Sequence, residues 1–477
     1  MGRVGKLLSN TAIFGAGTFI SKVLVFLLMP FYTAYLSSAE FGVADILVQT
    51  SNLIIPLAVL GISDGLFRFT LDADSARRKQ IFTSAILVLV IGVLPLALVI
   101  QALRGFDVYD GYVWLVFAYI CSANLHMIVA NYIRGCDKTK AYAVQGIVNT
   151  VLVISFNVLF LLVFDMGVMG YVLSVVLADF LVAVGLIIFF KLYKDVKFRE
   201  VNKPLMKDLL RFSIPYIPLT LMWTITSASD RFVILAVMGD GAVSVNGLYA
   251  AAYKLPTLIT IAGGIFIKAW QMSSVGEKDP KERASFFSTV YKNYLGIVFM
   301  GSACLIALAK VFTMLLLNES YYSSWVYVPM LVLAMAFSAF SEFLGSVYFV
   351  HKKSGRSLIT ASAGAIANIA LNFALIPFLG AVGAAIATVI CYAIVFFIRL
   401  FDTQKFIKFE RSLIKTILNV LLIVAQVILM TLELPYWWIY QIVIVSFVII
   451  FNGKDVFSAV KSLLKGKSKK AEKSKKI

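Results

Sequence analysis

The chain has 477 residues, of which 61% are hydrophobic and only 14% are charged. A soluble domain contains roughly 45–50% apolar and about 25% charged residues, so this composition excludes an ordinary soluble protein and predicts a membrane protein. The 43 Lys and Arg residues outnumber the 25 Asp and Glu residues, giving a net charge of +18. Nucleic-acid binding would require these cations to cluster on a folded soluble face, and the apolar composition excludes such a protein.

Apolar stretches long enough to cross a bilayer recur along almost the whole chain. In chain order the predicted spans are 11–35, 43–67, 81–103, 112–133, 141–164, 168–190, 212–238, 247–270, 288–312, 325–350, 357–378, 381–400, 414–431 and 436–452. The runs are continuously apolar, without the period-2 alternation of a membrane β-barrel. They predict an all-α polytopic membrane protein with about fourteen transmembrane helices.

The distribution of Lys and Arg predicts the orientation of these helices. Segments on the side that holds the N-terminus contain 38 of the cations, whereas the opposite side holds only Arg104 and Lys310. Cytoplasmic loops carry the excess of Lys and Arg in membrane proteins. We therefore expect both termini to be cytoplasmic, with an even number of spans.

An internal repeat divides the chain into two halves. The first and seventh spans carry similar polar stripes that end in a cation, Thr11, Gly15, Thr18 and Lys22 in one and Thr220, Thr224, Ser227 and Arg231 in the other. Each set lies on one helical face, because its steps are four, three and four residues. Two further matches have similar offsets, Gly42, Gln49 and Asn52 with Gly247, Lys254 and Thr257, and 167–170 with 380–383. Parallel repeats of this kind build many transporters.

The repeat predicts four regions and a central cavity. We expect an N-terminal lobe of helices 1–6 at 1–200, a C-terminal lobe of helices 7–12 at 205–402, an extra helix pair at 403–453, and a basic cytoplasmic tail at 454–477. Stripes of small and hydroxyl residues either pack helices together or line a wet cavity. The cation at the end of both stripes favours cavity lining, with Gln49, Asn52 and Thr257 continuing the polar surface.

Three cations, Lys22, Arg231 and Lys254, lie inside predicted spans. A charge at the bilayer centre costs about 2.5–3.5 kcal/mol on insertion scales, so such residues usually face a water-filled path or a partner. A cavity with fixed positive charge suits an anionic substrate, since Arg and Lys are the usual phosphate ligands. The intramembrane acids could form ion pairs with these cations or take part in ion coupling; they are Asp64, Asp179, Asp230 and Glu342.

No motif for a cofactor or a metal occurs in the sequence. It contains no nucleotide-binding phosphate loop and no dinucleotide or H-E-x-x-H motif, and its four cysteines are widely spaced. The two histidines, His126 and His351, are expected to be packing or interface residues rather than ligands. We therefore predict neither a metal nor an organic cofactor. We expect a transporter rather than an enzyme, and Na⁺ or H⁺ is the candidate coupling ion.

Four segments resemble polysaccharide flippases of the Wzx type. They are 368–388 with the sequence NIALNFALIPFLGAVGAAIAT, Ser229-Asp230-Arg231-Phe232, 249–255 with YAAAYKL, and Ala39-Glu40-Phe41-Gly42. The resemblance covers most of the chain and weakens in the last two helices.

This resemblance implies the fold of the multidrug/oligosaccharidyl-lipid/polysaccharide exporter superfamily, in the bacterial cytoplasmic membrane. It implies transfer of an undecaprenyl-diphosphate-linked oligosaccharide to the outer leaflet by alternating access, for cell-surface polysaccharide biosynthesis. Lys22, Arg231 and Lys254 would then bind the diphosphate or acidic sugars. A polysaccharide polymerase and glycosyltransferases would be partners in such a pathway, and the tail at 461–476 is expected to contact anionic membrane lipids.

Two alternatives to this function remain at the sequence level. One keeps the fold but exports a drug-like cation, or another lipid-linked precursor, in exchange for a cation as an antiporter. The other is a membrane-embedded sugar polymerase or transferase. Such enzymes usually present catalytic groups on a sizeable outer loop, whereas the longest outer connection here, 315–325, is short.

Overall fold

The computed structural model describes residues 24, 26–71, 73–198, 201–274, 280–351 and 353–454. All regular secondary structure in these ranges is helical, which confirms the predicted all-α class. The chain divides into two compact units. The first extends to Ala250 and includes Leu316–Tyr321; the second comprises Ala251–Leu315 and the residues from Tyr322 onward. The lobes predicted at 1–200 and 205–402 stay a prediction.

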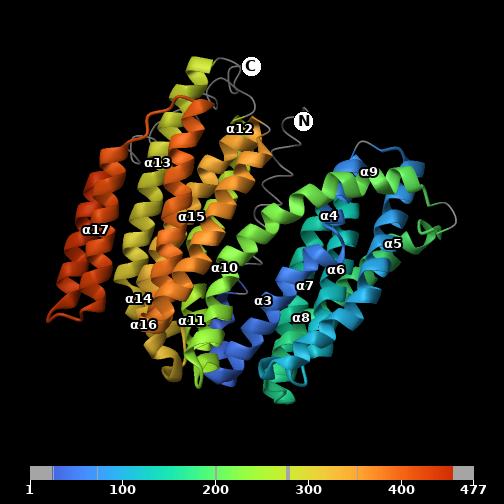
Figure 1. Cartoon of the computed structure of the whole chain (residues 1–477), viewed down its shortest axis with the longest axis horizontal. Helices are drawn as coiled ribbons and strands as arrows, with labels where there is room; N and C mark the ends of the chain where they lie inside the picture. Colours follow the sequence, from blue (N-terminus) through green and yellow to red (C-terminus); the bar gives the residue numbers. More distant parts are fainter. Residues whose placement is uncertain are drawn as a thin grey trace, which may run out of the picture. The chain divides into compact units, whose positions relative to one another are not determined.

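In the first unit, α6 is the central helix, because it packs against α3, α4, α5, α7 and α8 (Figure 1). The helices of this unit are α2 (Met29–Tyr35), α3 (Ser38–Ala58), α4 (Ile62–Leu71), α5 (Ser75–Val99), α6 (Val113–Gly135), α7 (Thr139–Asn157), α8 (Gly167–Phe189), α9 (Lys203–Ser213) and α10 (Ile217–Met238), with most of α11 (Ala242–Lys254). Short 3₁₀ turns at Ile100–Gly105 and Asp107–Tyr109 connect α5 to α6.

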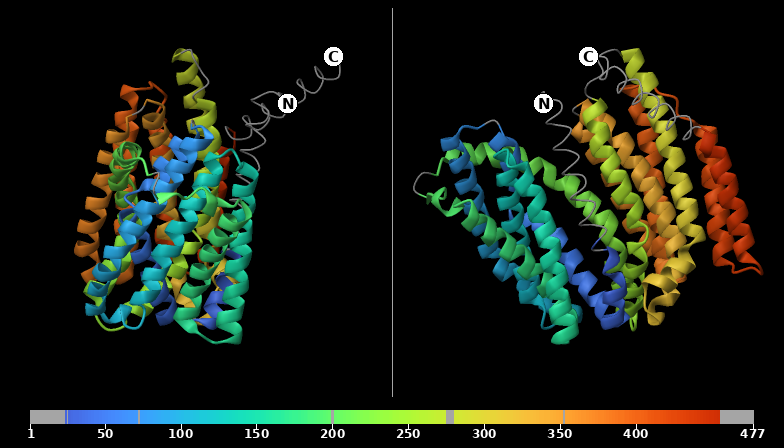
Figure 2. Two further views of the ribbon diagram at one scale, coloured as in Figure 1. Left: turned by 90° about the vertical axis from the view of Figure 1, so that its right-hand side faces the viewer. Right: turned by 180° about the vertical axis from the view of Figure 1, so that it is seen from behind.

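Helix α15 holds the corresponding central position in the second unit, where it packs against α12, α13, α16 and α17. The helices of this unit are α12 (Thr257–Ser274), α13 (Pro280–Ala307), α14 (Ala309–Leu316), α15 (Val328–Val350), α16 (Ser354–Asp402) and α17 (Leu413–Thr431), followed by a further span at Trp437–Lys454. The views in Figure 2 show α13, α15, α16 and α17 running side by side.

Helix α16 is a hairpin of two antiparallel helices rather than one long helix. Its backbone breaks at Gly380, where φ is 57° and ψ is −145°, a conformation essentially confined to glycine. Side chains on the two sides of the break bond to each other: Asn368 Nδ2 donates to Thr388 Oγ1 at 3.3 Å, and Arg399 Nε donates to Thr360 Oγ1 at 3.0 Å. The two predicted spans 357–378 and 381–400 therefore correspond to the two arms of α16.

The described helices agree with the predicted spans. Eleven are long and apolar enough to cross a membrane, and the bent pair Ala242–Lys254 and Thr257–Ile267 makes a twelfth. Counting the two arms of α16 separately gives thirteen in the described part of the chain. The predicted first span, 11–35, lies mostly outside the described residues. The protein is a multi-span membrane protein, as its composition predicts.

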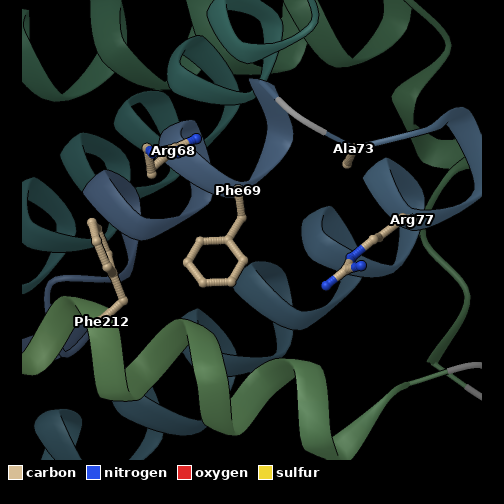
Figure 3. Close-up of a pocket in the computed structure, with 5 residues that line it drawn as sticks. All are labelled: Arg68, Phe69, Ala73, Arg77 and Phe212. Atoms are coloured by element: carbon tan, nitrogen blue, oxygen red, sulfur yellow. The ribbon is translucent and has the colours of Figure 1, made fainter.

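Helix α9 is amphipathic and lies across one end of α4 and α5 (Figure 1). It begins where the Asn202 side chain accepts a hydrogen bond from the Leu205 N–H at 3.0 Å, an N-cap that satisfies one free donor of the first turn. At its other end, the Phe212 ring meets the Phe69 ring of α4 edge-on, with the centroids 5.7 Å apart (Figure 3). The ring contact holds the end of α9 against α4.

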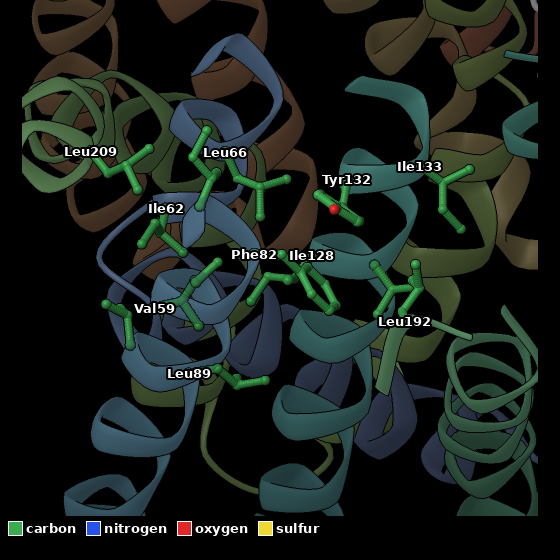
Figure 4. Close-up of a cluster of buried hydrophobic side chains, with 14 of the residues drawn as sticks. Val59, Ile62, Leu66, Phe82, Leu89, Ile128, Tyr132, Ile133, Leu192 and Leu209 are labelled. Carbon is green, nitrogen blue, oxygen red and sulfur yellow. The ribbon is translucent and has the colours of Figure 1, made fainter. Parts of the chain in front are cut away.

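A hydrophobic cluster joins α9 to the rest of the first unit (Figure 4). Its fully buried members include Val59, Ile62, Leu66, Phe82, Ile128 and Leu209. The Phe82 and Tyr132 rings stack with their centroids 4.4 Å apart. Helices in lipid associate through close van der Waals packing, and these contacts hold α4, α5, α6 and α9 together.

Helices α3 and α11 cross at two glycines that the sequence repeat matches to each other. A Cβ on Gly247 would lie 1.8 Å from the Ser38 carbonyl oxygen, and a Cβ on Gly42 would lie 2.0 Å from the Val243 oxygen. The Ser38 and Ser244 hydroxyl groups share a hydrogen bond of 2.6 Å beside this crossing. Small residues at helix interfaces in lipid permit such close backbone contact.

Candidate functional site

A buried ion pair joins α3 and α10 in the first unit. Arg231 Nε donates to Asp45 Oδ2 at 3.2 Å, and the exposed fractions of the two side chains are 3% and 8%. Arg231 Nη1 also donates to the Ser227 carbonyl oxygen, one turn earlier on α10, at 2.6 Å. A buried charge is tolerated when its partner and hydrogen bonds replace the lost water, and Arg231 has both.

Helix α11 adds an aromatic ring to this pair and a hydrogen bond to the neighbouring Asp230 of α10. The Arg231 guanidinium lies 5.3 Å from the centre of the Tyr249 ring, within the range of a cation–π interaction. The Tyr249 hydroxyl donates to Asp230 Oδ2 at 2.6 Å, and Asp230 is fully buried. Arg231 thus contacts a carboxylate from α3 and a ring from α11.

A polar pocket of about 390 Å³ lies beside the ion pair, between α3, α4, α6 and α10. It is lined by Gln49, Asn52, Ile55, Pro56, Val59, Gly61, Ser63, Met127, Tyr216, Ile217, Thr220, Thr224 and Ser227. Two contacts link the pocket to the pair: the Gln49 amide donates to Asp45 Oδ1 at 3.4 Å, and Ser227 accepts from Arg231. The lining is neutral, and the nearest ionisable residues along α3 and α10 are Asp45, Asp230 and Arg231.

Five of the residues predicted to line a cavity lie around this pocket. They are Gln49 and Asn52 on α3 and Thr220, Thr224 and Ser227 on α10. The matching stripe of the first span, Thr11, Gly15, Thr18 and Lys22, lies outside the described residues, as does the side chain of Asp64. That these side chains line the path of a substrate stays a prediction.

Three of the predicted site residues, Lys254, Thr257 and Glu342, belong to the second unit. Lys254 is the last residue of α11, and its carbonyl oxygen accepts a hydrogen bond from Thr257 Oγ1 at the start of α12. Glu342 lies on α15 with an exposed side chain. Arg231 and Lys254 are in different units, so their common role in substrate binding stays a prediction.

A second polar cluster, which the sequence did not reveal, lies among α6, α7 and α8. The two ring nitrogens of His126 face Asp179 Oδ1 at 2.8 Å and Gln145 Oε1 at 2.6 Å. Asn149 Nδ2 donates to the same Asp179 oxygen at 2.8 Å. His126 therefore lies at an interface of three helices and bonds to two of its neighbours. Asp179 pairs with this histidine, and Arg231 pairs with Asp45, a partner that the sequence analysis did not propose.

The sequence spacing carries little signal for either pairing. Asp45 and Arg231 are 186 positions apart, and His126 and Asp179 are 53 positions apart. The positions of Asp45, Gln49 and Asn52 on one face of a helix indicate a polar surface there, but they do not identify its partner. In the described part of the chain, no three His, Cys, Asp or Glu residues are grouped so that they could hold a metal ion.

The fold is similar to that of solved membrane transporters. The lipid II flippase MurJ in an inward closed conformation has a TM-score of 0.69 with 14% identity, covering 94% of this chain and 99% of that chain. An inward-facing multidrug resistance MATE family transporter of the MOP superfamily has a TM-score of 0.67 with 14% identity, covering 81% and 95%. A point mutant of the Vibrio cholerae MATE transporter VcmN has a TM-score of 0.57 with 16% identity, covering 84% and 97%. At such identities the likeness shows the fold.

The family follows from the sequence itself. No curated protein sequence matches the chain. The profile described as polysaccharide biosynthesis protein matches residues 7–270, more than half of the chain, including α3, the ion pair and the Tyr249 contact. With its many spans and its MurJ- and MATE-like fold, the protein belongs to the polysaccharide biosynthesis protein family.

Proposed function

We propose that the protein is a flippase that transfers an undecaprenyl-diphosphate-linked oligosaccharide from the cytoplasmic to the outer leaflet of a bacterial cytoplasmic membrane. The observation that carries this proposal is the buried Arg231–Asp45 pair beside a neutral, hydroxyl- and amide-rich pocket. Binding of sugars requires many uncharged hydrogen-bonding groups, whereas binding of a diphosphate requires a cation. The first unit offers both within one helical turn of α10.

The ion pair suggests how the anionic group would bind. A guanidinium holds carboxylates and phosphates with the same planar fork of N–H donors, so a phosphate can take the place of the Asp45 carboxylate. Asp45 would then be the counter-ion of Arg231 when substrate is absent. Exchange of one anion for the other avoids leaving the buried guanidinium unpaired, which is the costly state.

The family and the fold support this proposal. The family is named for polysaccharide biosynthesis, and the fold is shared with MurJ, a flippase of lipid II. Alternating access between two helical lobes is the common mode of repeat-built transporters. We propose the same motion here, with Lys22 and Lys254 as further ligands of the diphosphate or of acidic sugars, and with both termini on the cytoplasmic side.

The proposal is tested by reconstituting the protein in liposomes with a fluorescent undecaprenyl-diphosphate-linked oligosaccharide. We expect transfer between leaflets to fall to the protein-free rate after Lys22, Arg231 and Lys254 are changed together to Ala. Arg104, a cation of the predicted outer side, gives the control, because Arg104→Ala should transfer at the unmodified rate. Normal transfer by the triple variant would show that these three cations do not form the substrate site.

The His126 cluster is our candidate for energy coupling by protons. When both ring nitrogens carry protons, each donates to an acceptor, Asp179 or Gln145. The neutral ring can donate to only one of them, so gain and loss of a proton changes how α6 holds α7 and α8. Titratable Tyr119 on α6 and Asp179 on α8 face this site.

Changing His126 to Gln replaces the ring with a neutral amide side chain of similar length. We expect this variant to transfer substrate at the same rate with and without an imposed pH gradient, whereas the unmodified protein accelerates when the gradient is applied. His351→Gln is the control and should respond normally, because the His351 ring contacts the Val347 carbonyl oxygen of its own helix rather than a carboxylate of another span. A His126→Gln variant that still responds to the gradient would exclude this coupling site, and acceleration by Na⁺ alone would favour sodium.

Two other functions make different predictions. A multidrug exporter of the same fold would protect growing cells against cationic dyes when expressed. A membrane-embedded polymerase or transferase would lengthen the glycan when purified alone. Neither activity is expected of this protein.

A further inference from the structure

A second hollow in the first unit lies at the ends of α4, α5 and α9. It has a volume of about 360 Å³ and is lined by Arg68, Phe69, Ala73, Arg77 and Phe212 (Figure 3). The two arginines come from different helices, Arg68 from α4 and Arg77 from α5, and both are exposed. Figure 3 shows the Phe69 ring between them. The hollow is distinct from the polar pocket beside Arg231, with which it shares no lining residue.

The other cations at the start of α5 already have acidic partners. Arg78 lies 4.0 Å from Asp137, and Lys79 lies 3.1 Å from Asp195. The Asp74 carboxylate beside the hollow caps α5 by accepting the Arg77 backbone N–H at 2.8 Å. For the Arg77 side chain, no hydrogen bond or ion pair occurs with any described residue. Arg77 is therefore an available cation on the wall of a preformed hollow.

The position of the hollow matches the depth of lipid headgroups. Helix α5 carries its charges over 75–80 and is uncharged and mainly apolar from Ile81 to Val99, so its first turns mark where a span leaves the hydrocarbon core. Helix α9 lies across this end with Leu205 and Leu209 buried and with Lys203, Lys207 and Arg211 exposed. The surface around the hollow is thus basic, as is typical of segments that attract anionic lipid.

From this arrangement we propose that the hollow binds the headgroup of an anionic glycerophospholipid. The Arg68 and Arg77 guanidinium groups hold the phosphate, and the Phe69 and Phe212 rings contact the glycerol and the first acyl carbons. Aromatic rings favour this boundary, where one edge is apolar and the other is wet. The hydrophobic cluster beneath keeps α4, α5 and α9 in place, so the site does not have to form around the lipid (Figure 4).

Native mass spectrometry of the full chain in detergent, titrated with dioleoyl phosphatidylglycerol, tests the site. We expect one phosphatidylglycerol to bind the unmodified protein, and to bind the Arg68→Gln/Arg77→Gln variant at least about tenfold more weakly, since each cation near anionic lipid contributes about 1 kcal/mol. The matched control is Lys203→Gln/Lys207→Gln, which removes two charges from the exposed face of α9 and should retain the bound lipid.

Three outcomes would overturn the proposal. Equal loss of lipid in both double variants would mean diffuse attraction rather than a site. Equal binding of phosphatidylcholine would mean that the headgroup charge is not recognised. Displacement of the lipid by millimolar inorganic phosphate would assign the hollow to a soluble anion. The variants replace exposed side chains, and an unchanged elution volume on gel filtration shows that they are folded; the result is independent of transport.

Discussion

The Asp45→Asn variant is expected to lose on the order of 3–5 kcal/mol of unfolding free energy, because it leaves the Arg231 charge buried without its counter-ion. Asn has nearly the shape of Asp, so the loss of unfolding free energy results from removal of the negative charge and not from a cavity. Arg231→Gln should be destabilised by a similar amount through the unpaired Asp45 carboxylate. Thermal and denaturant unfolding of the purified protein in detergent measures both effects.

The double variant Asp45→Asn/Arg231→Gln separates the pair from its two members. Neutral groups of similar volume often replace a buried ion pair at little cost, so we expect the double variant to recover most of the stability that either single variant loses. Additive losses in the double variant would mean that the two residues act independently, contrary to the 3.2 Å contact between them.

Gly247→Ala is expected to disrupt the packing of α11 on α3. Its Cβ would lie 1.8 Å from the Ser38 carbonyl oxygen, and a backbone atom cannot move aside without separating the two helices. Overpacking typically costs about 1–3 kcal/mol, and a contact this short against backbone should cost at least about 3 kcal/mol. We expect a clear fall in folded yield and in the midpoint of thermal unfolding.

Gly185→Ala on α8 is the matched control for this effect. A Cβ there meets no atom within 4 Å, and Ala is a better helix former than Gly by about 1 kcal/mol. The control should therefore be as stable as the unmodified protein or slightly more stable. If Gly247→Ala behaves in the same way, the close crossing at Gly42 and Gly247 is not present in the folded protein.

The membrane fold could be predicted from the sequence because a bilayer imposes simple rules on it. Each span needs a long apolar run. Two such runs predicted the two arms of α16 as separate spans, and the structure separates these arms at Gly380. The repeat also equated Gly42 with Gly247, and the structure places these two glycines in contact. Helical periodicity placed Thr220, Thr224 and Ser227 on one face of α10, and that face lines the pocket.

The partners of the buried charges could not be predicted in the same way. Periodicity describes one helix at a time, whereas the partner of Arg231 comes from α3 and its aromatic contact from α11. The sequence suggested Asp179 as a neutralising acid, but tertiary packing places Asp179 against His126. Distances between helices depend on how side chains pack across them, and no local pattern in the chain encodes that arrangement.

Leaflet transfer by the Asp45→Asn/Arg231→Gln variant tests the central claim most directly, because this variant should be folded yet lack the cation. The measurement uses liposomes that contain a fluorescent undecaprenyl-diphosphate-linked oligosaccharide and equal amounts of folded protein. If Arg231 exchanges Asp45 for the diphosphate, the variant transfers the lipid no faster than protein-free liposomes. Transfer at the rate of the unmodified protein would show that Arg231 only holds α3 and α10 together, and would contradict its role in substrate binding.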